Sequence, residues 1–261
     1  MRFYFWVLTT LLLPATLLAE TVFLKDGKTH AARELRRDGN FLFYKATTPD
    51  GSQADTITPI NQVERIEFGE HPAMEAAREL ANQGDALGVL EKTTDPAAFF
   101  RGYSDVPGNQ WAEVMRLRLP AIAVAGTEQH IATLQAQWTP TGDLELDTAY
   151  KLIIAAKNDP NGARTAWKAL AQPGASSLSA GISWLGIGNE ALLSKQWNAA
   201  VRAFLSVEVF VTQQKLLQPK ALLGAAKAFV QKGETGKATA LVEELKKEYP
   251  PVAEEAASIL K

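Results

Sequence analysis

The chain has 261 residues, of which 46% are hydrophobic and 21% charged, and its formal net charge at pH 7 is -2. Cysteine is absent, which excludes disulfide bonds, thiolate metal sites and cysteine nucleophiles. A surface this close to neutral gives no reason to expect nucleic acid or an anionic membrane as a partner.

Residues 1–19 have the pattern of a secretory signal peptide. Arg2 carries the only charge, Phe3 to Leu13 form an apolar run of the usual length, and the segment ends on a small residue. We therefore expect cleavage after Ala19 and a chain exported to the periplasm or cell envelope, with no membrane span after cleavage. An uncleaved membrane anchor is the alternative, because the apolar run to Leu18 is near the lower length limit for a span.

Residues 20–70 alternate between apolar and polar side chains, which is the period of a β-strand. Turns are marked at Asp26-Gly27, Asp38-Gly39-Asn40 and Pro49-Asp50-Gly51, each with a residue that tolerates positive φ. A single 3₁₀ turn is expected over Pro59 to Val63. The expected strands are Val22 to Lys25, Lys28 to Arg37, Phe41 to Thr47, Gln53 to Thr58 and Glu64 to Phe68.

Five such strands have the size of a small barrel. The opening Leu24 to Lys28 and the closing Val63 to Phe68 resemble the SH3-like or Sm-like barrels at the start of exported bacterial repeat proteins. The resemblance implies a five-stranded β-barrel over residues 20–70. A simple three- or four-stranded sheet packed on the first helix is the alternative.

Residues 181–250 carry one helix-pair pattern twice, in copies 181–212 and 219–250 that are offset by 38 residues. Small residues at Gly188 and Ala226 are expected to let the two helices of each pair approach closely, and Gly233 is expected to reverse the chain in the second copy. The remaining members of the pattern are Trp184, Ile187, Ala191, Trp197, Ala200, Phe204 and Val207 in the first copy and Leu222, Ala225, Phe229, Thr235, Ala238, Val242 and Leu245 in the second.

This pattern resembles the tetratricopeptide repeat, a helix pair of about 34 residues. Upstream, residues 73–92, 110–138 and 144–171 have weaker forms of it, and 93–109 are expected to be an irregular insertion. The resemblance implies a helical solenoid of about four to five helix pairs over residues 71–261. The expected fold is therefore α+β and mostly α-helical.

No constellation of residues indicates catalysis, a cofactor or a metal. The histidines His30, His71 and His130 are far apart in the sequence, and none has a second ligand at helical spacing. The carboxylate pairs near the C-terminus alternate with lysines and indicate solvated helix faces. We therefore expect a protein without enzymatic activity.

The first helix of each repeat lines the concave side in the tetratricopeptide family, so the resemblance assigns partner binding to those helices. The inward positions of the two copies are Ile182, Leu185, Asn189 and Leu192, and Lys220, Leu223, Lys227 and Gln231. Such a groove favours an amphipathic helix or an apolar strand. The alternative is that the leucines are simply buried against a neighbouring helix.

The expected function is that of a non-enzymatic periplasmic or cell-envelope scaffold that binds a protein or peptide partner. One alternative is a self-associating structural subunit, a homo-oligomer in which Trp111, Trp138 or the insertion at 93–109 packs against another copy. A second is an enzyme that uses His71, Tyr103 or Asp105.

Overall fold

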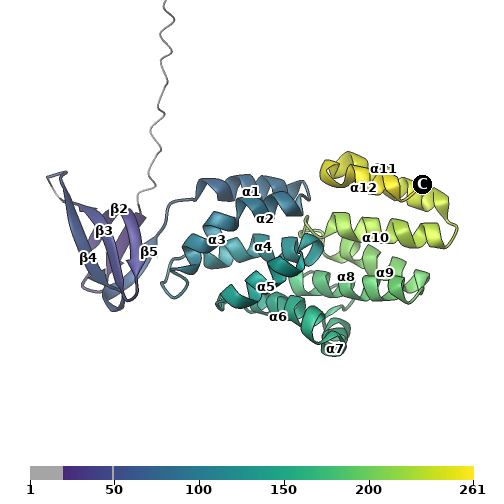
Figure 1. Cartoon of the computed structure of the whole chain (residues 1–261), viewed down its shortest axis with the longest axis horizontal. Helices are drawn as coiled ribbons and strands as arrows, with labels where there is room; N and C mark the ends of the chain where they lie inside the picture. Colours follow the sequence, from purple (N-terminus) through teal and green to yellow (C-terminus); the bar gives the residue numbers. More distant parts are fainter. Residues whose placement is uncertain (1–19, 49) are drawn as a thin grey trace, which may run out of the picture. The chain divides into compact units, whose positions relative to one another are not determined.

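The computed structural model describes residues 20–48 and 50–261, and the expected signal segment at 1–19 lies outside them. The chain divides into two units at Gly69, which we call the sheet unit and the helical unit (Glu70–Lys261). The described residues form five strands and twelve α-helices, so the protein is α+β and mostly helical (Figure 1).

The sheet unit is one antiparallel sheet with strand order β4-β3-β2-β1-β5. Gly27, Gly39 and Gly51 have positive φ in the turns before β2, β3 and β4, as the sequence predicts. Val22, Leu42 and Ile66 are fully buried and belong to its core. The strands are β1 (Glu20–Leu24), β2 (Thr29–Asp38), β3 (Phe41–Thr47), β4 (Gln53–Pro59) and β5 (Val63–Glu67).

The prediction of a closed barrel is wrong. Among the described residues β4 and β5 are the two edges of the sheet and do not pair with each other. The 3₁₀ turn η1 (Ile60–Gln62) joins them, with Ile60 N donating to Asn40 O and Lys25 N donating to Gln62 O. This turn carries the chain across one end of the sheet instead of forming a hairpin, so β5 pairs with β1 and the sheet stays open.

The helical unit begins with shorter helices and continues with helices of up to 16 residues. Its first half contains α1 (Pro72–Asn82), α2 (Ala86–Lys92), α3 (Thr94–Arg101), α4 (Trp111–Ala125), α5 (Glu128–Gln137), α6 (Leu144–Asn158) and α7 (Pro160–Leu170). Its second half contains α8 (Leu178–Leu193), α9 (Trp197–Phe210), α10 (Gln218–Gln231), α11 (Thr235–Glu248), the 3₁₀ turn η2 (Pro250–Val252) and α12 (Ala253–Ser258).

Consecutive helices pack as pairs in α1–α2, α6–α7, α8–α9 and α10–α11. The pair α6–α7 packs on α8–α9, which in turn packs on α10–α11. Gly233 has a φ of +77° at the turn between α10 and α11, as predicted. The expectation that residues 93–109 are irregular is wrong in part, because 94–101 form α3. Pro96 lies in the first turn of α3, where its missing N–H group is not needed.

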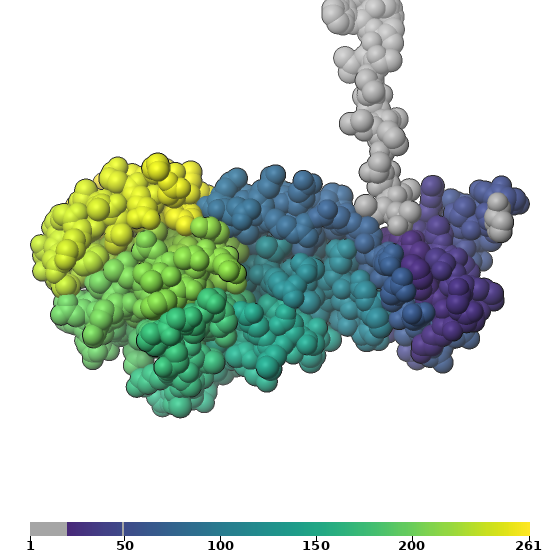
Figure 2. All heavy atoms as spheres, turned by 180° about the vertical axis from the view of Figure 1, so that it is seen from behind, coloured from purple at the N-terminus to yellow at the C-terminus, as the bar shows by residue number. Residues whose placement is uncertain are grey.

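The two ends of the helical unit meet. A β-carbon at Gly84, in the turn between α1 and α2, would lie 2.6 Å from Pro219 and 2.8 Å from Tyr249. Figures 1 and 2 both show the C-terminal helices (yellow) beside α1 and α2 (blue). The helices therefore do not form an open-ended stack, and α10 has the first hairpin of the unit as a neighbour.

Candidate binding pocket

Glycines on α8 let three other segments approach that helix. β-Carbons at Gly186 and Gly188 would lie 2.5 Å from Trp167 of α7 and 2.7 Å from Phe204 of α9. A β-carbon at Gly181 would lie 2.5 Å from Leu217. The predicted close approach at Gly188 is confirmed, and α8 is held tightly between α7 and α9.

A pocket of about 370 Å³ opens beside α8, and we call it the α6–α8 pocket. Leu152 and Ile153 of α6 and Ile182 and Leu185 of α8 line it, and all four side chains are at most 7% exposed. Trp167 of α7 also lines it. A cavity of this size with an apolar lining has the dimensions of a typical ligand site.

Few polar groups line this pocket. Arg164 Nε of α7 lies 2.5 Å from Glu190 Oε1 of α8, and Arg164 Nη1 donates to Asn161 Oδ1. Asn189 is exposed on α8, one turn from Leu185. Trp167 Nε1 is buried and has no hydrogen-bond partner among the described residues. The charges of Arg164 and Glu190 neutralise each other, so the pocket presents a nearly uncharged surface.

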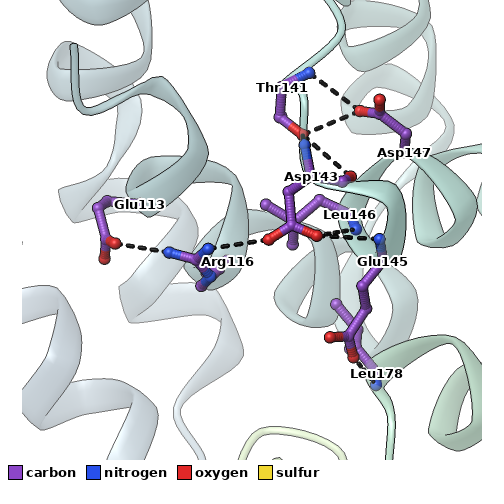
Figure 3. Close-up of polar contacts among 8 residues, drawn as sticks. All are labelled: Glu113, Arg116, Thr141, Asp143, Glu145, Leu146, Asp147 and Leu178. Atoms are coloured by element: carbon purple, nitrogen blue, oxygen red, sulfur yellow. Dashed lines mark hydrogen bonds and ion pairs between the residues drawn. The ribbon is translucent and has the colours of Figure 1, made fainter. Parts of the chain in front are cut away.

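A polar network joins three of the helices around the pocket (Figure 3). Arg116 of α4 donates to Glu113 and to Asp143 Oδ2, the latter at 2.8 Å. Asp143 Oδ1 accepts from the backbone amides of Glu145 and Leu146 and so caps α6. The Glu145 carboxylate in turn accepts from the backbone amide at the start of α8. The network therefore fixes α4, α6 and α8 relative to one another.

The charge state of Asp143 stabilises this polar network. Partial burial raises the pKa of its carboxyl, but the bonds from Arg116, Leu146 and Glu145 outweigh burial, and the net result is a lowered pKa. Asp143 is therefore ionised at neutral pH, as its ion pair with Arg116 requires.

Five of the eight predicted partner-binding residues line two separate pockets instead of one groove. Ile182, Leu185 and Asn189 line the α6–α8 pocket. Lys220 and Leu223 line a second pocket of about 200 Å³ near Gly84 and Pro251. The remaining three, Leu192, Lys227 and Gln231, line neither pocket.

The chain itself covers part of the inward face of α10. Leu223 is 2% exposed and belongs to an apolar cluster with Tyr249 and Ala256. Lys227 Nζ lies 3.0 Å from Glu255 Oε1 of α12. Leu223 is thus buried against neighbouring segments, as is Leu185 at 4% exposed, and it lines the smaller of the two pockets. We therefore take the α6–α8 pocket as the candidate site.

Sequence reasoning missed the side of the pocket formed by Arg164 and Trp167. Trp167 could have been found, because it matches the second helix of the repeat frame and Gly186 leaves room for a large side chain. Arg164 and Glu190 are far apart in the sequence and carry no pattern that pairs them.

Four residues of the two alternative hypotheses are buried or make contacts within the chain. Trp111 is 4% exposed and donates from Nε1 to Thr139 O, so the proposed contact of Trp111 with another copy is wrong. Trp138 stacks on Tyr150 with ring centroids 3.9 Å apart. His71 Nδ1 accepts from Ala73 N at the start of α1, and Tyr103 is 3% exposed.

Two kinds of feature are absent from residues 20–48 and 50–261. No three His, Asp or Glu side chains there gather closely enough to hold a metal ion. None of the helices there combines the length and apolarity needed to cross a membrane.

The chain matches none of the protein families, curated proteins or solved structures with which it was compared. Its function must therefore be inferred from its own geometry.

Proposed function

We propose that the protein is a non-enzymatic scaffold of the bacterial periplasm or cell envelope that binds a protein partner through its helical unit. The observation that carries this proposal is the α6–α8 pocket, where three of the predicted partner-binding residues lie together. The stacked pairs α8–α9 and α10–α11, with small residues at the predicted close approaches, support a tetratricopeptide-like repeat as the frame.

The chemistry of the pocket supports binding over catalysis. Its two charged side chains, Arg164 and Glu190, are paired with each other. The buried lining is aliphatic or aromatic, and it would gain free energy by removing apolar surface of a partner from water. Leu193 at the end of α8 lines the pocket and is 86% exposed, so apolar surface continues outward from the pocket. A well-formed apolar pocket with few polar groups is the default candidate for a binding site.

Site-directed photo-crosslinking tests this function. A photoreactive residue placed at position 193 should crosslink one specific envelope protein in living cells. The same residue at position 209 is the matched control, because Val209 lies on α9, is 63% exposed and does not line the pocket. With the captured protein purified, Leu193→Glu should weaken its binding at least tenfold. Equal crosslinking at 193 and 209, or unchanged affinity in Leu193→Glu, would count against the proposal.

Light scattering distinguishes the scaffold from the alternative function, a self-associating subunit. A self-associating subunit would change its mass with concentration, and its crosslinks from position 193 would join two copies of this chain. A monomer that crosslinks to a different protein supports the scaffold.

A further inference from the structure

The hydrogen-bonding capacity of the α6–α8 pocket is small relative to its apolar surface. Apart from the mutually paired Arg164 and Glu190, the polar side chain that lines it is Asn189, together with the buried indole N–H of Trp167. The indole N–H is not accessible to solvent. The side-chain groups that a bound ligand can reach are therefore the amide of Asn189 and the Arg164–Glu190 pair, whose side chains are 41% and 35% exposed.

This scarcity discriminates between two forms of a peptide ligand. An extended peptide brings unpaired N–H and C=O groups at every residue, and each one that is buried without a partner costs free energy. Asn189 and one charged pair cannot satisfy a whole run of them. An α-helix pairs its backbone groups internally and needs only apolar contacts from the surface that it meets.

The charge and extent of the surface agree with a helix. The Arg164–Glu190 pair leaves the pocket without net charge, which suits uncharged apolar side chains. Side chains at positions i, i+3, i+4 and i+7 of a helix form one stripe, and such a stripe can fill the pocket and also cover Leu193. We infer that the occupant is an amphipathic α-helix of a different protein, which inserts its apolar stripe into the α6–α8 pocket; this inference rests on the proposed function.

A second copy of this chain does not fit the same description. The large apolar side chains that are exposed on its described helices of eight or more residues are Leu144, Leu193 and Val209, one on each of α6, α8 and α9. None of these helices therefore offers a free apolar stripe to another copy. Since the described helices of this chain offer no such stripe, we assign the stripe to another polypeptide.

Selection from two peptide libraries tests the inference. Both libraries have the same length and the same composition of Leu, Ile, Ala, Lys and Glu. In one the apolar residues follow helical spacing, and in the other they alternate as in a strand. Each library is selected on the purified protein, and the affinity of every binder is then measured on the Leu193→Glu variant. The Val209→Glu variant is the matched control and should keep every binder within twofold.

We expect the helical library to yield peptides that bind at least tenfold more weakly to Leu193→Glu and that become helical on binding, as circular dichroism measures. These peptides should also displace the partner captured from position 193. Enrichment of the alternating library, or of neither library, would overturn the inference. If a captured partner depends on Leu193 and no helical peptide displaces it, the scaffold function stands and the helical occupant does not.

Discussion

The ring of Phe204 lies against Gly188, so that a β-carbon at this glycine would be 2.7 Å from Cε1 of the ring. A β-carbon at Gly224 of α10 would be 2.5 Å from Cζ of the same ring. Phe204 is 1% exposed. Its ring is therefore in close contact with both glycines, so α8, α9 and α10 are joined through a single side chain.

The first prediction is that Gly188→Ala destabilises the protein. Alanine is favoured over glycine within a helix by about 1 kcal/mol. Overpacking of a filled core costs about 1–3 kcal/mol, and the trapped ring of Phe204 leaves no room to relax. We expect a net loss in the free energy of unfolding, measured by urea titration.

Gly236→Ala is the matched control for this prediction. Gly236 lies on α11, and no heavy atom lies within 4 Å of the place where its β-carbon would be. This variant should be unchanged or more stable by up to about 1 kcal/mol. If Gly188→Ala were as stable as Gly236→Ala, the described packing of Phe204 would be incorrect.

The second prediction concerns the coupling of Gly188 and Phe204. Phe204→Leu alone should destabilise the protein because it leaves a cavity between α8 and α10. The same shortening makes room for a methyl group at position 188. The double variant should therefore lose less stability than the sum of the two single variants, with a coupling of about 0.5–3 kcal/mol in a double-mutant cycle. Strictly additive losses would show that the two side chains do not share the space.

The parts of the fold that were predictable depend on local chemistry. The turns at Gly27, Gly39 and Gly51 need positive φ, so the sequence itself marks the strand boundaries. The small residues of α8 likewise mark where neighbouring helices approach. Such signals lie within a few residues of the feature that they predict.

The parts that were not predictable depend on contacts between distant segments. Nothing in the alternation of β4 and β5 shows that the turn at Ile60–Gln62 places them on opposite edges. Similarly, nothing in the pattern of α10 shows that Glu255 pairs with Lys227, or that Gly84 lies against Pro219. The predicted groove is divided for this reason. The repeat pattern predicts which face of each helix points inward, but contacts of α10 with α12 and with the α1–α2 turn determine which of those faces stay exposed.

The third prediction concerns Asp143 in the polar network that joins α4, α6 and α8. Asp143→Ala removes the cap of α6 and the ion pair with Arg116, and we expect a loss of about 0.5–2 kcal/mol at pH 7. The pKa of Asp143 is lowered in the folded protein, so its stabilising effect is complete above the ordinary value of 3.8 and is lost as the pH falls through the lowered pKa. The difference between wild type and variant should therefore shrink below about pH 4.

Asp143→Asn is the control for the Asp143→Ala variant. Its side-chain oxygen can still accept from the amides of Glu145 and Leu146, so the cap remains and only the ion pair with Arg116 is lost. We expect a smaller loss than in Asp143→Ala when both are measured by urea unfolding at pH 7. A loss in Asp143→Ala that stays constant from pH 7 to pH 3 would contradict the assigned ionisation.

The fourth prediction is that Lys227 takes no part in partner binding at the α6–α8 pocket. The side chains of Lys227 and Glu255 are 46% and 48% exposed, and ion pairs of this kind contribute at most about 1 kcal/mol. Lys227→Glu should therefore lower stability slightly, and Glu255→Lys in the same chain should restore it. Partner capture from position 193 should be the same in Lys227→Glu as in wild type. Loss of capture in this variant would extend the binding surface to α10.

The fifth prediction concerns Glu208 on α9. Burial raises the pKa of its carboxyl, and the nearby Glu244 raises it further. Because this pKa is raised in the folded state, the charged carboxylate destabilises the fold above the raised pKa, and the penalty disappears as the pH falls below the ordinary value of 4.5. Glu208→Gln should therefore be more stable than wild type at pH 7 by a few tenths of a kcal/mol, about the size of a like-charge pair on a helix surface. The gain should vanish at pH 4. Glu254→Gln, at an exposed position on α12, should show no comparable gain. An equal gain there would indicate a general effect of net charge instead of the burial of Glu208 and its repulsion from Glu244.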